Sequence, residues 1–240
     1  MGTGSGYECC AKLWRCKCIQ NGSLIRDFIP AMRNSDGVIG LIDVVNNVFY
    51  TNAGSGYFLC NYSWLNYIES TGTQYINTSI AENLVYGIEM DCIVTGLATN
   101  WQSLLSGALD NFTIGSVDTS KTSFYLRLRT EEICRPTEMF SDKANTISIK
   151  NGLVHLNGNH VGTYTHGALS TADGALYIFA NNALSRYGIM RLYRLKLYNS
   201  SGNMIRDYAP CNYGGSIGLF DKVTNTFHSN AGTGSFKTGY

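Results

Sequence analysis

The chain contains one block of residues twice, and this repeat constrains the fold more than any other feature. The earlier copy is Leu13–Phe58 and the later copy is Leu192–Phe236. Between Leu41–Phe58 and Leu219–Phe236, 10 of 18 residues are identical without a gap. The copies lie a whole domain's length apart, far more than one unit of a solenoid.

The repeat predicts the domain organisation. We expect residues 61–240 to form one complete domain that ends in the later copy, and residues 1–60 to be a partial repeat. The earlier copy would then be a β arm that holds the closing strands of a domain without the rest. Its apolar faces and strand edges would need a cover, so we expect the arm either to dock onto the complete domain or to pair with another subunit.

Alternation with a period of two indicates strands throughout the chain. In the earlier copy Trp14, Cys16 and Cys18 share one face, and Arg15 and Lys17 share the other. Asn-Gly and Ser-Gly pairs supply tight turns between such runs. Many short strands at this spacing predict an all-β fold, an antiparallel sandwich of two sheets.

Prolines recur at the same place in both copies. We expect the strands that begin at Leu24 and Met204 to end before Pro30 and Pro210, because proline cannot donate to a continuing ladder. The adjacent pair Glu131-Glu132 is interpreted as a surface loop.

The cysteines near the start allow three interpretations. Cys9, Cys10, Cys16 and Cys18 could bind zinc or form disulfides, but their spacing is not that of paired zinc ligands. Cys16 and Cys18 align with leucines of the later copy, which favours small apolar side chains on a core face.

Composition excludes several function classes. The net charge of +1 argues against binding to nucleic acid, and no apolar run is long enough to span a membrane or to resemble a signal peptide. Only 15% of residues are charged, so Asn, Ser, Thr and Gly must make up much of the solvent-exposed surface.

Several motifs together resemble the concanavalin-A-like, laminin-G-like jelly roll found in proteins of gut bacteria and their phages. The motifs are Tyr67–Thr78, Asn157–Asn159, Leu176–Ala180, Leu195–Tyr198, Ile205–Tyr208 and Gly218–Phe236. The resemblance implies two packed, curved antiparallel sheets. It also implies a non-catalytic role in virion fibres, tails, capsid decorations or cell-surface proteins, often with glycan binding.

Catalysis has little support in the sequence. Glu89 and Asp91 share one face of a predicted strand, but two acids on one strand are typical of a solvated face. Asp43 and Asp221 occupy the same place in the two copies, each before an Asn-containing turn. Ca²⁺ is possible there, but capping of the turns is the favoured interpretation, and we expect no metal and no other cofactor.

A glycan site needs an aromatic plane and a few fixed polar groups. The candidate ligand-binding residues are Trp101, Asp110, Asn111, Tyr125, Arg127 and Arg129. Tyr125, Arg127 and Arg129 would serve only if their face of the strand is exposed, and an ordinary solvent-facing sheet remains the alternative.

The leading hypothesis is a non-catalytic structural or adsorption protein of a phage particle, located in the virion. Its partners would be a host surface glycan or neighbouring virion proteins, and the chain would form a homo-oligomer. A carbohydrate-binding module of a secreted or cell-surface bacterial protein is the first alternative, and a divergent glycoside hydrolase is the second.

Overall fold

The structure is a computed structural model of the chain. It describes residues 13–33, 38–54, 62–96, 101–107, 112–116, 123–128, 131–136, 142–164, 174–181 and 183–239, without the side chains of Ser116, Ser123, Leu128 and residues 131–136. The chain divides into two compact units, Met1–Ser63 and Trp64–Tyr240. Within the described ranges no helix is long and apolar enough to cross a membrane.

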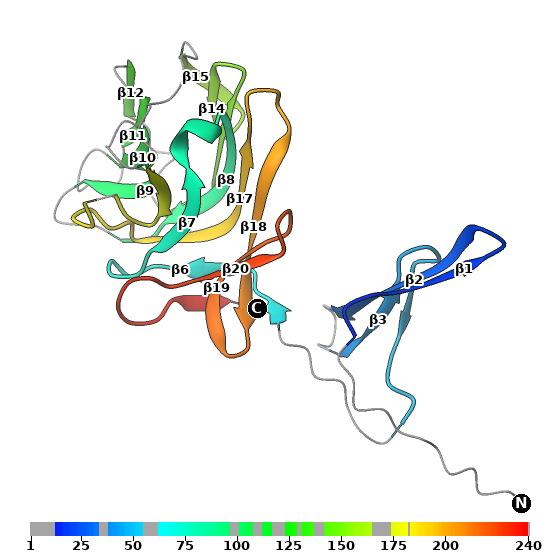
Figure 1. The fold of residues 1–240 in the computed structure, drawn as a ribbon. Coiled ribbons are helices and arrows are strands. Elements are labelled where there is room, and N and C mark those ends of the chain that lie inside the picture. Colours follow the sequence, from blue (N-terminus) through cyan, green and yellow to red (C-terminus); the bar gives the residue numbers. More distant parts are fainter. Residues whose placement is uncertain are drawn as a thin grey trace, which may run out of the picture. The chain divides into compact units, whose positions relative to one another are not determined.

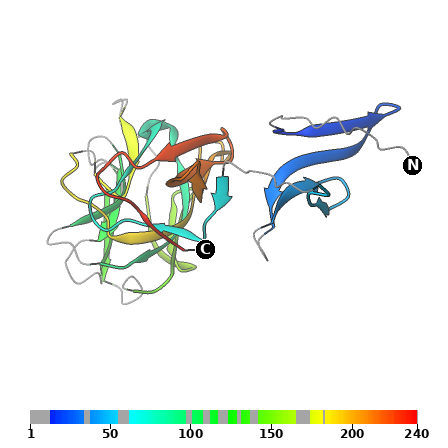
Figure 2. The same ribbon diagram turned by 90° about the horizontal axis from the view of Figure 1, so that it is seen from below.

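The first unit is one antiparallel sheet in the order β1-β2-β3-β4. Its strands are β1 (Cys16–Gln20), β2 (Ser23–Met32), β3 (Ile39–Asp43) and β4 (Val48–Tyr50). Figure 2 shows the sheet with β1 as its outermost strand. A two-residue turn joins β1 to β2, and both Asn21 and Gly22 have the positive φ that such turns require.

The second unit is an antiparallel sandwich of two sheets of the jelly-roll kind, as the sequence predicts (Figure 1). One sheet has the order β12-β11-β10-β9-β16-β7. Its strands are β7 (Ile76–Ala81), β9 (Gln102–Ser106), β10 (Phe112–Ser116), β11 (Ser123–Leu128), β12 (Glu131–Pro136) and β16 (Ala175–Ile178).

The other sheet follows the path β15-β14-β13-β8-β17-β18-β19-β20. Its strands are β8 (Gly87–Val94), β13 (Asn145–Lys150), β14 (Leu153–Leu156), β15 (Asn159–Thr163), β17 (Met190–Tyr198), β18 (Met204–Tyr213), β19 (Ser216–Asp221) and β20 (Thr226–Ser229). Short additional elements are β5 (Tyr62–Trp64), β6 (Tyr67–Glu69), β21 (Lys237–Gly239) and the 3₁₀ turn η1 (Glu82–Leu84).

The core of the second unit lies between these two sheets. Met90, Leu192 and Leu195 enter it from the β8–β17 pair, and Phe124 and Ile178 enter it from the opposite sheet; all are fully buried. On β8 and β17 the residues between them are more exposed, as alternation requires. The apolar pattern read from the sequence therefore selects the inner face of each sheet.

The two copies of the repeat have the same strand register. Cys18 pairs with Arg26 in the first unit, and Leu197 pairs with Arg206 in the second. A bulge follows at the next residue in both copies. The sheet β1-β2-β3-β4 is thus the structural counterpart of β17-β18-β19-β20.

Both prolines lie within strands, so the prediction that they end the strands was wrong. Pro30 pairs with Leu41, and Pro210 pairs with Leu219. The carbonyl of Pro210 accepts the Leu65 N–H at 3.0 Å, on the edge of β18 opposite to β19. Because the N and C=O of one strand residue point to the same edge, the missing N–H also faces away from β19. The missing N–H therefore leaves the β18–β19 ladder intact. On the edge that it faces, the pairing with β17 has already ended at Tyr208, and the neighbour is the short strand β5.

The interpretation of Glu131-Glu132 as a loop was also wrong. Both residues begin β12, which pairs with β11 in the register Leu128–Glu131 and Arg127–Glu132. Adjacent acids disfavour a strand only by local propensity, and pairing with a neighbouring strand overrides that preference.

Candidate functional site

Trp101 is the centre of a stack of side chains at the start of β9. Its ring packs edge-on against Tyr125 of β11, with the ring centroids 5.0 Å apart. The guanidinium carbon of Arg186 lies 5.1 Å from the Trp101 ring centroid, a cation–π contact. Trp101 remains 38% exposed, so solvent reaches part of this aromatic plane.

The other residues predicted for this site differ in their placement. Tyr125 is only 3% exposed, contrary to the expected solvent-facing position, because Trp101 packs against it. Arg127 is exposed on the same strand. Asp110, Asn111 and Arg129 lie outside the described residues. The structure thus brings Trp101 and Tyr125 together and makes Tyr125 a support for the exposed ring.

Three tyrosines that the sequence analysis did not select form a second group of rings. Tyr75 packs against Tyr177 and Tyr187, with ring centroids 6.1 and 6.4 Å apart. All three are half-buried, and Tyr187 directly follows Arg186 in the chain. We call Tyr75, Tyr177, Tyr187, Arg186, Trp101 and Tyr125 the aromatic band.

Buried polar side chains hold the segment that carries Arg186. The Asn181 carboxamide oxygen accepts the Ser185 and Arg186 N–H groups, both at 2.9 Å. Gln102, next to Trp101, accepts the Ile189 N–H at 2.8 Å and donates to the Gly96 carbonyl at 2.8 Å. Asn181 and Gln102 are each 1% exposed. These bonds order the segment and strand that bring the cation to the Trp101 ring.

The sequence contained only a weak signal for this band. Tyr177 lies between Leu176 and Ile178 in a predicted strand, so alternation alone places it on the outer face. No local pattern connects it with Tyr75 or Arg186, which lie on other segments. Tyr177 and Tyr75 come together through the pairing of β7 with β16, and Arg186 lies on the loop after β16.

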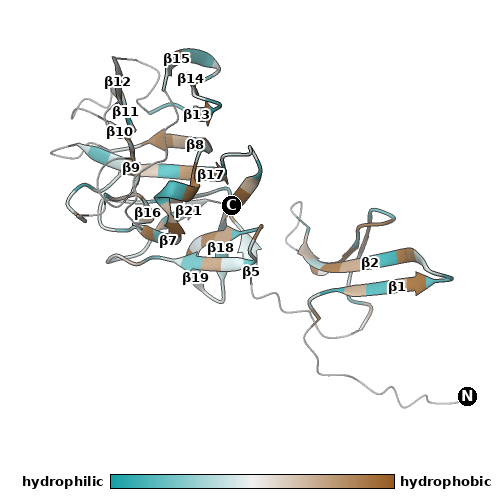
Figure 3. Ribbon diagram, turned by 45° about the horizontal axis from the view of Figure 1, so that its top comes forward, coloured by the Kyte–Doolittle hydropathy of each residue, from teal (hydrophilic) through white to brown (hydrophobic). Residues whose placement is uncertain are grey.

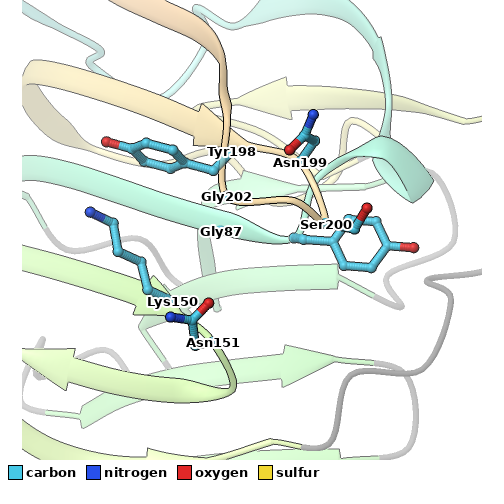
Figure 4. Close-up of a pocket in the computed structure, with 8 residues that line it drawn as sticks. Gly87, Lys150, Asn151, Tyr198, Asn199, Ser200 and Gly202 are labelled. Carbon is cyan, nitrogen blue, oxygen red and sulfur yellow. The ribbon is translucent and has the colours of Figure 1, made fainter.

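A hollow of about 380 Å³ opens near the ends of β8, β13 and β17 (Figure 4). Its lining is formed by Tyr86, Gly87, Lys150, Asn151, Tyr198, Asn199, Ser200 and Gly202. Figure 4 shows the Lys150 and Tyr198 side chains on β13 and β17, the two strands that flank β8, with Asn151 and Asn199 at the adjoining turns. The sequence analysis had interpreted these segments only as strands and the turns between them, with no site there.

Glu89 organises the charged side of this hollow. The Lys150 ammonium forms an ion pair with Glu89, and the Tyr198 hydroxyl donates to Glu89 Oε2 at 2.9 Å. Burial acts to raise the pKa of Glu89, but the bonds from Lys150 and Tyr198 outweigh it, so the pKa lies below the ordinary value. Burial and the bond to Glu89 raise the pKa of Tyr198 to about 12. At neutral pH Glu89 is therefore a carboxylate that accepts hydrogen bonds from the Lys150 ammonium and from the neutral Tyr198 phenol.

Asp91 has a separate set of partners on the same outer face. It pairs with Arg194 at 3.2 Å and accepts from Thr146 Oγ1 at 2.9 Å. Glu89 and Asp91 therefore each have their own cation. This arrangement matches the solvated face that the sequence favoured over a catalytic pair.

The repeated aspartates cap their own turns. Asp221 Oδ1 accepts the Val223 and Asp207 N–H groups at 3.0 and 3.1 Å. Asp43 makes the same bonds to Val45 and Asp27, both at 3.1 Å. Burial acts to raise the pKa of Asp43, but the bonds to its carboxylate outweigh burial and lower the pKa. The part of the chain that the structure describes has no cluster of three or more His, Cys, Asp or Glu side chains suited to a metal ion.

The cysteines of the first unit are free thiols where the structure describes them. Cys16 and Cys18 are half-buried and unbridged, and Cys9 and Cys10 lie outside the described residues. Burial, followed by the neighbouring Cys16, raises the pKa of Cys18. The Cys16 and Cys18 side chains share the apolar face of the sheet, as the alignment with leucines predicts, but they are only half-buried there.

Comparison with protein families finds no family that matches, and comparison with curated proteins finds no match either. Among solved structures, the chain matches a crystal structure described as a "putative carbohydrate binding protein from Bacteroides ovatus". The two are 11% identical, and the match covers 88% of this chain and 68% of that chain with a TM-score of 0.49.

Proposed function

We propose that this chain binds carbohydrate without catalysis, through the aromatic band of its second unit. The observation that carries the proposal is the partly exposed Trp101 ring, which packs against Tyr125 and contacts the Arg186 guanidinium. A group of three half-buried tyrosines includes Tyr187, the residue after Arg186. Sugar rings present C–H faces that pack on aromatic planes, and their hydroxyls accept from guanidinium groups. A surface of this composition suits a glycan better than a charged or purely apolar ligand.

Preorganisation supports the same conclusion. Asn181 and Gln102 are buried and hydrogen-bonded to the backbone that presents Arg186 and Trp101. Positioning these groups before binding lowers the entropy that binding must overcome. The band is therefore a better candidate than a mobile loop with the same residues.

Glycoside hydrolysis is the less favoured candidate. It needs two carboxylates on either side of one bond, one of them held as the acid. Glu89 and Asp91 are each paired with a separate cation, and the pKa of Glu89 is lowered rather than raised. A proton donor in a glycosidase requires the opposite shift.

The test is a screen against an array of bacterial surface glycans, followed by calorimetric titration of the hits. Trp101→Ala and Arg186→Ala should each weaken binding at least about tenfold, or ~1.4 kcal/mol. Trp14→Ala removes another exposed tryptophan, in the first unit, and should leave the affinity unchanged. Melting curves must show that the second unit stays folded in each variant. The proposal fails if no glycan binds, or if neither substitution changes the affinity for a glycan that does bind.

We further propose that the chain acts in a phage particle, as a structural or adsorption protein that contacts host glycan or a neighbouring virion protein. This part rests on the resemblance of the Tyr67–Thr78 and Gly218–Phe236 motifs to virion jelly rolls. Mass spectrometry of purified particles should detect the chain. Its absence from particles, with presence in the culture supernatant or on the bacterial surface, would favour the secreted bacterial module instead.

A further inference from the structure

The strand β1 has an open edge that its counterpart in the second unit does not have. In the second unit β17 lies between β8 and β18. In the first unit β1 pairs with β2, and no described strand pairs with its other side. We call this other side the open edge. An unpaired edge is a template for another strand.

The apolar face beside the open edge is exposed to solvent, whereas the equivalent face of the second unit is buried. Leu13 is 48% exposed, whereas its counterpart Leu192 is fully buried. Tyr50 at the far side of the sheet is 42% exposed. Figure 3 shows apolar residues, in brown, along both β1 and β2. Within the described part of the first unit, this sheet thus has a core face without an opposing sheet.

The second unit shows which strand chemistry fits this edge. There Lys196 lies opposite Glu89, and Arg194 lies opposite Asp91 and forms a 3.2 Å ion pair with it. The inward residues of β8, such as Met90, are apolar and fully buried. An occupant of the β17 edge therefore has carboxylates on one face and apolar side chains on the other.

The first unit has the same cations at the same positions. Arg15 and Lys17 correspond to Arg194 and Lys196. Arg15 bonds back to Asp27 of its own sheet at 2.7 and 2.5 Å. Its counterpart Arg194 instead forms an ion pair with Asp91 of the neighbouring strand β8. The positive outer face of β1 is therefore complementary to a strand with the acid pattern of β8.

Two other occupants fit less well. A second copy that paired β1 with β1 would place the basic face of one strand beside the basic face of the other, and like charges across strands are destabilising. The chain's own β8 is already paired on both edges, with β13 and β17. Neither source supplies an available acidic strand.

We propose that the open edge of β1 accepts an antiparallel strand from a partner protein, with carboxylates facing Arg15 and Lys17 and apolar side chains facing Cys16 and Cys18. The partner also supplies a second apolar layer over the sheet. The first unit then acts as the closing half of a sandwich whose other half belongs to the partner. This inference does not depend on glycan binding, because it concerns the first unit alone.

The test uses the full chain and a synthetic peptide with the sequence of residues 86–95, in which Cys92→Ala prevents disulfide formation. Hydrogen exchange should show new protection of the amides of β1 when this peptide is added. The Glu89→Lys version of the peptide should bind at least tenfold more weakly. The Lys17→Glu chain should reverse that preference, because Lys17 corresponds to Lys196, which faces Glu89.

Lys17 lies opposite the buried Asp27, so a glutamate at position 17 would place two acids side by side and could unfold the sheet. A second variant without an added acid controls for this. Lys17→Ala adds no acid there and should bind the two peptides with affinities within about threefold of each other. Absence of protection in β1, or equal affinity of the unsubstituted chain for both peptides, would overturn the proposal. A self-associated chain whose β1 is already protected would overturn it too, and would identify a second copy as the occupant.

Discussion

The two copies of the closing block share their internal bonds but differ in burial. Arg26 pairs with Asp43 at 3.3 Å in the first unit, and Arg206 pairs with Asp221 at 3.3 Å in the second. An edge-to-face ring pair also recurs, Phe28 with Tyr50 at 5.6 Å and Tyr208 with His228 at 5.5 Å. The conformation of the block is therefore set by contacts within it.

The difference lies in what surrounds the block. Leu195, Leu197 and Leu219 of the later copy are fully buried, whereas their counterparts Cys16, Cys18 and Leu41 are half-buried. The later copy receives its cover from β8 and from the opposite sheet. The comparison separates two contributions to stability: turn and ion-pair contacts, which both copies have, and core burial, which the second unit has in full.

The largest expected effect comes from the shared ion pair. Asp221 is fully buried and accepts from two backbone N–H groups, Thr224 and Arg206. Asp221→Ala leaves these donors without their acceptor and should reduce the free energy of unfolding of the second unit by about 3–5 kcal/mol. Chemical denaturation followed by circular dichroism measures the loss.

Asp43→Ala is the matched change in the first unit. It should unfold the first sheet, seen as loss of hydrogen-exchange protection in β2 and β3, without moving the unfolding midpoint of the second unit. A shift of the second unit of the same size would show that the two units unfold as one, and would break the comparison.

Core truncation should separate the copies most clearly. Leu192 is fully buried, so Leu192→Ala should cost about 3 kcal/mol of unfolding free energy. Leu13 is 48% exposed, so Leu13→Ala should cost less than about 1 kcal/mol. Denaturation of each variant measures both values. Equal costs would mean that the face of the first unit is covered in solution.

A steric constraint should act alike in both copies. A Cβ on Gly218 would lie 2.2 Å from the His228 carbonyl oxygen, and a Cβ on Gly40 would lie 2.1 Å from that of Tyr50. Gly218→Ala should therefore cost about 2 kcal/mol through backbone displacement. Gly202→Ala is the control, because its positive φ adds strain of about 1 kcal/mol without a clash. Thermal unfolding should rank the two variants in that order.

The smallest expected effect is on pH dependence. Burial lowers the pKa of His228, so the folded state binds its proton less readily than the unfolded chain. Its contribution is intact above the unfolded pKa of about 6.5 and is lost as the pH falls below that value. Because His228 is half-buried, the loss should stay below about 1 kcal/mol.

His228→Tyr introduces the residue that the first unit has at this position, Tyr50. Unfolding midpoints at pH 7.5 and 5.5 should then differ less in the variant than in the unsubstituted chain. An unchanged difference would assign the pH dependence to other groups.

Much of the fold could be predicted because its signals are local. The hairpin of β13 and β14 follows from alternation around Asn151-Gly152, where a turn with positive φ is needed. The strands that continue through Pro30 and Pro210 could not be predicted. Whether a missing N–H is harmful depends on which neighbour lies beside it, and that neighbour comes from elsewhere in the chain.

The candidate site divides in the same way. Trp101 and Tyr125 were selected because aromatic residues beside polar ones suit a sugar. Arg186 was not selected, because the sequence holds no sign that it lies over the Trp101 ring. The hollow beside Lys150 was missed because its walls come from the ends of three strands that lie far apart in the sequence.

The sequence by itself determined the repeat, the strand alternation and the turn chemistry of Asp43 and Asp221, because these depend on neighbours within one hairpin or two. Only the tertiary structure decided that Tyr125 is buried, that Arg186 lies over Trp101 and that β17 has a partner where β1 has an open edge. Each of these depends on contacts between residues far apart in the chain. Similar local blocks thus differ in burial when only one of them is surrounded by the rest of a sandwich.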